Sequence, residues 1–119
     1  MQCIKNAIIK NADIMIEDHG ILTCLLMLDY GGNGQGFGGY AFDQWDENKK
    51  CRVGFAYGID FILGIFKALD IYEWGNLTGK PIRVDTDGEF GKILGIGHFI
   101  KDSWFYPEEL RIKMQTVLR

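Results

Sequence analysis

Residues 29–40 have the sequence Asp-Tyr-Gly-Gly-Asn-Gly-Gln-Gly-Phe-Gly-Gly-Tyr, and the rest of the chain is organised around them. Six of these twelve residues are glycine. Glycine loses the most conformational freedom on folding, so a connection this rich in glycine carries a cost that the fold must offset. In return, glycine adopts positive φ and lets a ligand or another chain approach the backbone. The stretch is therefore expected to be a loop between two strands and part of a binding site.

Segments with strand character lie on both sides of this loop. Residues 3–16 are rich in β-branched side chains and predict one strand with a bulge near Asn11. Residues 17–20 are polar, end in glycine and indicate a hairpin turn. Residues 21–30 are apolar on both faces and predict a central strand covered on both sides. Beyond the loop, residues 39–43 alternate as a third strand, and the charged residues 44–50 predict a solvent-exposed loop.

One long helix is predicted from residue 54 or 55 to residue 69 or 70. Its inward stripe is expected at helical spacing, on Ile59, Ile62, Leu63 and Phe66. A neighbouring face is also apolar and carries Phe61, Ile65 and Ala68. An apolar surface this wide exceeds what one sheet face covers, so either the helix is deeply buried or its second face meets another subunit. A homodimer is the expected assembly.

The remaining elements complete an α+β pattern. Residues 81–85 and 92–100 predict a fourth and a fifth strand, and residues 102–106 predict an aromatic loop. Pro107 opens a short C-terminal helix. The order β-β-β-α-β-β-α predicts one domain over residues 1–119, in which an antiparallel-rich sheet of about five strands packs on the long helix.

Composition limits the class of protein. The chain has 119 residues, 47% of them hydrophobic and 24% charged, which are ordinary values for one globular domain. A net charge of −3 gives no electrostatic basis for general nucleic-acid binding. Neither a signal peptide nor an apolar run of the ~18 residues that a membrane helix needs is visible, so a soluble protein with an intracellular, cytoplasmic location is expected. The three cysteines are odd in number and lack CxxC spacing, which favours reduced thiols over disulfides or zinc.

Motifs for phosphate binding are matched only in part. Gly34–Gly39 fits the pattern G-x-G-x-x-G, but a dinucleotide-binding turn must open a helix, and residues 40–42 have strand character. The protein-kinase glycine loop does lie between strands, but its lysine, HRD and DFG partners are missing. A phosphate-cradling loop is the lesser alternative to a structural loop or an interface.

Catalytic and metal-binding residues are not predicted. His19 and His98 are the only histidines, and neither has the spacing of a metal ligand; His98 is expected to be an ordinary hydrogen-bonded strand histidine. Ser103 is the only serine and lacks an elbow motif. We therefore expect no cofactor and no enzymatic activity.

Aromatic and amide side chains around the glycine stretch are the strongest candidates for binding. Aromatic rings beside glycine backbone suit stacking on a base or anchoring a protein interface. Phe37, held between glycines, is the ring least expected to be buried. The predicted binding residues are Tyr30, Asn33, Gln35, Phe37, Tyr40 and Trp104.

Three runs of sequence, residues 16–21, 28–40 and 96–105, resemble a small protein family encoded by phages and prophages, with DYGGxGQGFGGY as its distinctive motif. The resemblance covers most of the chain but carries over no functional residue. It implies a small phage accessory protein. Such proteins often act stoichiometrically on host defence, as anti-CRISPR inhibitors and as sponges for nucleotide immune signals, so an anti-defence protein of one of these kinds is expected. The expected function is non-catalytic inhibition of a host defence protein through the glycine loop and its aromatics. The alternatives are a sponge that holds a nucleotide-like immune signal in a pocket between subunits, with an Arg or Lys, and a small enzyme of unknown reaction.

Overall fold

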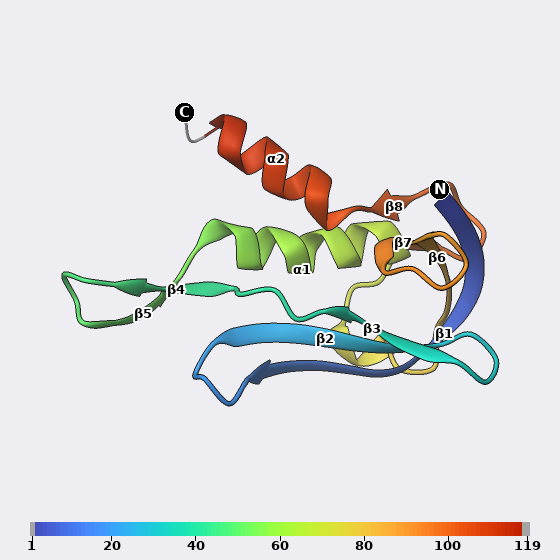
Figure 1. Cartoon of the computed structure of the whole chain (residues 1–119), viewed down its shortest axis with the longest axis horizontal. Helices are drawn as coiled ribbons and strands as arrows, with labels where there is room; N and C mark the ends of the chain where they lie inside the picture. Colours follow the sequence, from blue (N-terminus) through green and yellow to red (C-terminus); the bar gives the residue numbers. More distant parts are fainter. Residues whose placement is uncertain (1, 118–119) are drawn as a thin grey trace.

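The chain forms a six-stranded antiparallel sheet with two helices stacked over one part of it, as the computed structural model in Figure 1 shows. The structure describes residues 2–117. The α+β class predicted from the sequence is confirmed, with six strands in the main sheet in place of about five. The strands are β1 (Gln2–Ile16), β2 (Leu22–Asp29), β3 (Gly34–Gly38), β4 (Asp43–Asp46), β5 (Cys51–Gly54), β6 (Pro81–Asp87), β7 (Ile93–His98) and β8 (Trp104–Phe105); the helices are α1 (Ala56–Leu69) and α2 (Pro107–Val117).

The order of strands in the main sheet is β3-β2-β1-β6-β7-β8, and β4 and β5 form a separate hairpin. β1 pairs with β6 over Gln2–Ile8 and with β2 over Ile8–Ile16, so its two halves have different neighbours. The predicted bulge is present, since the register shifts between Ile9 and Asn11. Bulges bend strands, and Figure 1 shows β1 curving away from β2 in its N-terminal half.

The third strand lies earlier in the chain than the sequence predicted. Residues 39–43 do not form a strand that pairs with the main sheet; β3 is built from the glycine stretch itself and pairs with β2. Gly38 and Gly39 have φ of 114° and 81°, which ends the regular ladder of β3. The Gly39 and Phe42 N–H groups still donate to the Cys24 and Leu22 carbonyls of β2, both at 2.8 Å, so this segment follows β2 without forming a regular strand. The expectation of one continuous loop over residues 29–40 is therefore wrong: only the turn ahead of Gly34 is a loop of that kind.

The segment 44–50 is not a plain solvent loop, because it contains most of β4 and the turn that leads into β5. The Asp46 carboxylate accepts the backbone N–H groups of Asn48 and Lys49, at 2.8 and 3.0 Å. A carboxylate that bonds its own backbone two or three residues onward stabilises a tight turn. The polar composition of this segment thus marks the turn of a hairpin.

Helix α1 has nearly the predicted bounds but packs through the other apolar face. Its buried residues are Gly58, Phe61, Ile65, Ala68 and Leu69. Of the predicted stripe, Ile62 and Phe66 are partly buried and pack against the core, whereas Ile59 and Leu63 are 63% and 45% exposed. Glycine explains the choice of face. A Cβ at Gly58 would lie 2.6 Å from the Cβ of Phe42, and one at Gly64 would lie 2.5 Å from the Phe105 ring. The homodimer expected from the second apolar face stays a prediction.

The core lies between α1 and the sheet and is rich in aromatic rings. Phe61 is fully buried at its centre, with the rings of Phe42 and Phe105 at centroid distances of 5.1 and 4.9 Å. The opposite face of β2 is less covered than predicted, because Met27 is 37% exposed there. α1 covers only one face of the sheet, so a strand that is apolar on both sides leaves part of one side open.

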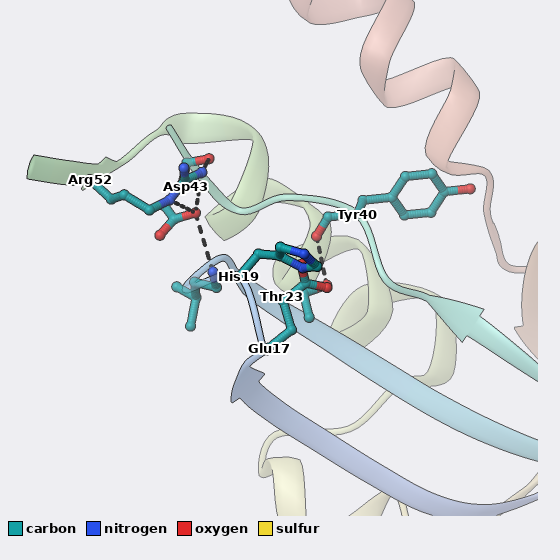
Figure 2. A network of polar contacts seen from close by, with 7 residues as sticks. Glu17, His19, Thr23, Tyr40, Asp43 and Arg52 are labelled. Carbon is teal, nitrogen blue, oxygen red and sulfur yellow. Dashed lines mark hydrogen bonds and ion pairs between the residues drawn. The ribbon is translucent and has the colours of Figure 1, made fainter. Parts of the chain in front are cut away.

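A polar network joins the β4–β5 hairpin to the start of β2 (Figure 2). Residues 30–33 follow the other end of β2. The Asp43 carboxylate accepts a hydrogen bond from Arg52 Nε at 3.0 Å and one from the Leu22 N–H at 3.2 Å. The Arg52 bond, as the largest cause, lowers the pKa of Asp43. Thr23 Oγ1 donates to the Tyr40 carbonyl at 2.6 Å. These contacts fix the path of the chain between β3 and β4.

Candidate functional site

The predicted site begins at the glycine turn, which we define as residues 30–33. The Tyr30 N–H donates to the Asn33 carbonyl at 2.8 Å and closes the turn. The Asp29 carboxylate accepts the N–H groups of Gly31 and Gly32 at 2.9 and 3.2 Å. Both hydrogen bonds lower the pKa of Asp29, and the bond from Gly32 has the larger effect. A carboxylate of the chain itself thus occupies the donors that a phosphate would need, and β3 uses the following glycines in its pairing with β2.

Three of the predicted binding residues do meet beside this turn. Tyr30 Oη donates to Gln35 Oε1 at 3.2 Å, and Asn33 lies exposed between them in the chain. Burial raises the pKa of Tyr30, so its phenol stays protonated as a hydrogen-bond donor at neutral pH. Their proximity follows from the sequence, since they are close neighbours along the chain.

Two parts of the chain that the sequence did not suggest complete the site. Lys5 of β1 places its Nζ 5.4 Å from the centroid of the Tyr30 ring and 5.8 Å from that of Phe90. Lys5 Nζ also donates to the Glu89 carbonyl. The result is a cleft of about 360 Å³, here called the turn cleft, lined by Lys5, Tyr30, Asn33, Gly34, Gln35, Glu89 and Phe90.

Both missed residues are unusual for their positions. Lys5 has the same strand phase as Ala7 and Ile9, which are buried, so a charged side chain there points toward the core face. This phase is a signal that the sequence does contain. Phe90 is 88% exposed in the turn between β6 and β7. A large ring that exposed, beside a cation and a second ring, is the feature that most resembles a binding surface.

The other three predicted binding residues lie elsewhere. Phe37 is only 2% exposed and packs against Phe61 and Phe105 with centroid distances of 5.7 and 6.4 Å. The expectation that it would be exposed is therefore wrong: its side chain has the core-facing phase, opposite Leu26 of β2. Tyr40 is 45% exposed and contacts Phe61 in the region that joins β3 to β4.

Trp104 lies in β8, at the edge of the sheet farthest from β3. The Arg83 guanidinium is 4.9 Å from the Trp104 ring centroid, and Trp104 Nε1 donates to Asp102 at 3.1 Å. Trp104 also lines a cleft of about 570 Å³ between α1 and α2. None of the other predicted binding residues lines that cleft, so it is a separate feature.

A buried carboxylate contacts Tyr106, whose ring is stacked on that of Trp104. Asp85 is 1% exposed, and its Oδ2 accepts hydrogen bonds from Tyr106 Oη at 2.7 Å and Gln2 Nε2 at 2.9 Å. The pKa of Tyr106 is raised to about 12, mainly by burial of the phenol and also by its hydrogen bond to Asp85. The cluster ties the start of β1 to the segment after β8, so its contacts indicate a structural role.

Histidines and possible metal ligands are scattered. His98 Nδ1 accepts the N–H groups of Ile100 and Lys101, both at 3.0 Å, so it is a hydrogen-bonded strand histidine as predicted. His19 is exposed, with its Nδ1 3.9 Å from Glu17 (Figure 2). Within residues 2–117, no three His, Cys, Asp or Glu side chains gather as a metal site would require. Neither described helix has the length and apolar character needed to cross a bilayer.

Comparison of the chain with protein-family models, with curated proteins and with solved structures finds no match. The function is therefore inferred from the residues of the turn cleft.

Proposed function

We propose that this protein is a non-catalytic binding protein that recognises its partner at the turn cleft. The observation that carries the proposal is Phe90, a ring 88% exposed beside the Lys5 ammonium and the Tyr30 ring. Exposed aromatic and cationic side chains at the rim of a cleft are typical anchors of protein interfaces.

Binding is favoured over catalysis by the state of the groups in the cleft. Tyr30 has a raised pKa and donates to Gln35, so it is poorly suited to act as a base. Lys5 is held by the Glu89 carbonyl between two rings. Groups fixed in this way present a shaped surface. The resemblance to phage proteins extends the proposal to the partner, a host defence protein that is inhibited stoichiometrically in the host cytoplasm.

A nucleotide-like small molecule is the second candidate, and Lys5 is the observation that favours it. A lysine beside two aromatic rings combines charge for a phosphate with surfaces for stacking on a base. The cleft lies within one chain, whereas the sponge hypothesis expected a pocket between subunits. Asp29 already fills the backbone donors of the turn, which weighs against a phosphate at that point.

Affinity capture from bacterial lysate, with native mass spectrometry of the protein alone, tests both candidates. The wild-type protein should retain a defined partner protein at a fixed ratio, and Phe90→Ala should lose it. Tyr72→Ala is the matched control, because Tyr72 is 86% exposed but does not line the turn cleft. Capture that is absent, or equal for wild type and Phe90→Ala, contradicts the proposal. A nucleotide that is retained by wild type and lost in Lys5→Gln supports the second candidate.

A further inference from the structure

The edge of β1 that lies beside the turn cleft has no strand partner. β2 pairs with β1 only as far as Ile8, opposite Asp29, and then leaves through the glycine turn. From Gln2 to Ala7, β1 pairs with β6 on its other edge alone among the described strands. The N-terminal half of β1 therefore presents an open edge, which begins where β2 ends (Figure 1).

The alternation of hydrogen bonds along β1 shows which of its backbone N–H and C=O groups face the edge without a partner strand. The Ile9 N–H donates to the Lys80 carbonyl at 3.0 Å, and Lys80 directly precedes β6, so Ile9 points to the β6 edge. Backbone groups alternate between the two edges of a strand, so Ile4 and Asn6 direct their N–H and C=O to the open edge. Both residues are exposed. Unpaired donors and acceptors in a row are a template for another strand.

Clefts flank this edge on both faces of the sheet. The turn cleft lies on the face of Lys5, which is paired with the buried Val84. A second cleft, of about 400 Å³, lies on the face of Ile8 and its partner Pro81, and its lining is completed by Asn6, Ala7, Asp29, Tyr30, Gly31 and Phe99. Successive side chains of a strand point to opposite faces, so an added strand would place alternate side chains in the two clefts.

We infer that an extended peptide segment of the partner protein docks here, by adding as a strand to the open edge of β1. The inference rests on the proposed function, since it states how the partner reaches the turn cleft. The chemistry of the clefts defines the segment: apolar side chains toward Ile8 and Pro81, alternating with polar or acidic side chains toward Lys5. The backbone of the segment forms hydrogen bonds with the backbone groups of Ile4 and Asn6. It thereby occupies the position beside β1 that β2 leaves when it enters the glycine turn.

Asn6→Pro is the test variant. Proline removes the open N–H and places its ring on that edge, while the Asn6 N–H takes no part in the ladder with β6. An unchanged melting temperature verifies that the fold is retained. Asn6→Ala is the matched control, because it shortens the side chain but keeps the N–H. The probe is a display library of random twelve-residue peptides selected on the wild-type protein.

Selected peptides should bind Asn6→Pro at least ~10-fold more weakly, and Asn6→Ala within a few-fold of wild type. Binding should also slow hydrogen exchange of the Ile4 and Asn6 amides. The inference is overturned if no peptide is enriched or if Asn6→Pro binds as wild type does. It is also overturned by a dimer in light scattering that Asn6→Pro dissociates, because a second copy is then the occupant.

Lysate capture separates the two proposals. If Phe90→Ala loses the captured protein but Asn6→Pro retains it, the turn cleft is the site and strand addition is wrong. If both variants retain it, the proposed function itself is wrong. Loss in both variants, together with retention by Asn6→Ala, supports both proposals.

Discussion

The two halves of the glycine-rich stretch use glycine for different physical reasons. In the glycine turn, Gly31 and Gly32 have φ of 83° and 113°, and no atom lies within 4 Å of the place where a Cβ would be. At the end of β3, Gly38 also has a positive φ, of 114°, but a Cβ there would lie 2.4 Å from the Cys24 carbonyl oxygen. The turn needs glycine for conformation alone, whereas Gly38 also needs it for close packing. Of the two, only the turn glycines have open space where a partner could approach the backbone.

The same contrast holds for the two phenylalanines that these regions involve. Phe37 in β3 is 2% exposed within the aromatic core, while Phe90 beside the turn is 88% exposed. The core half of the stretch should therefore govern folding, and the turn half should govern recognition.

The largest effect is expected for Phe37→Ala. Removal of a buried ring leaves a cavity and should lower the free energy of unfolding by about 3–5 kcal/mol. Phe90→Ala is the matched control and should change it by no more than about 0.5 kcal/mol. Urea denaturation of both variants measures the difference. Equal destabilisation by the two substitutions would contradict the assignment of folding to the core half and recognition to the turn half.

The next effect separates two glycines of similar φ. Gly38→Ala combines a strained backbone with overlap against the Cys24 carbonyl and should cost about 2–4 kcal/mol. Gly32→Ala adds a methyl group in open space and should cost about 1–2 kcal/mol from the backbone alone. The two melting curves, recorded under one set of conditions, test the order. A Gly32→Ala protein less stable than Gly38→Ala would show that the turn is packed in solution.

What the sequence predicted well depends on neighbours along the chain. The β-branched run of β1 with its bulge, the limits of α1 and the grouping of Tyr30 with Gln35 all follow from local pattern. The packed face of α1 did not, because both of its faces are apolar and the choice depends on Phe42 and Phe105 meeting Gly58 and Gly64.

The candidate site shows the same limit. The Lys5 ammonium donates a hydrogen bond to the carbonyl of Glu89, which lies 84 residues later in the sequence. A contact between residues this far apart cannot be predicted from a local sequence pattern. Phe37 was misjudged because glycine neighbours suggested a mobile loop. The residues instead pair with β2, and in that ladder Phe37 lies opposite the fully buried Leu26. Strand pairing is decided by the partner, which a single segment does not reveal.

The smallest effect concerns Asp29, whose carboxylate holds the glycine turn. The Gly32 and Gly31 N–H groups lower its pKa from 3.8. A carboxyl group with a lowered folded pKa contributes stability above its unfolded pKa and loses that contribution as the pH falls through the folded value. The turn should therefore stay closed at neutral pH and loosen only below about pH 4.

NMR can follow this opening through the Asp29 carboxyl shift and the exchange rates of the Gly31 and Gly32 amides. Asp29→Asn keeps an oxygen acceptor without the charge, so the turn should persist with faster amide exchange and no such change near pH 4. The aromatic core half of the stretch should be unaffected in both proteins, because Phe37 packs away from the turn. An Asp29 carboxyl that titrates at or above 3.8 would mean that the turn is open in solution. The glycine turn would then lack the fixed shape on which recognition at the turn cleft depends.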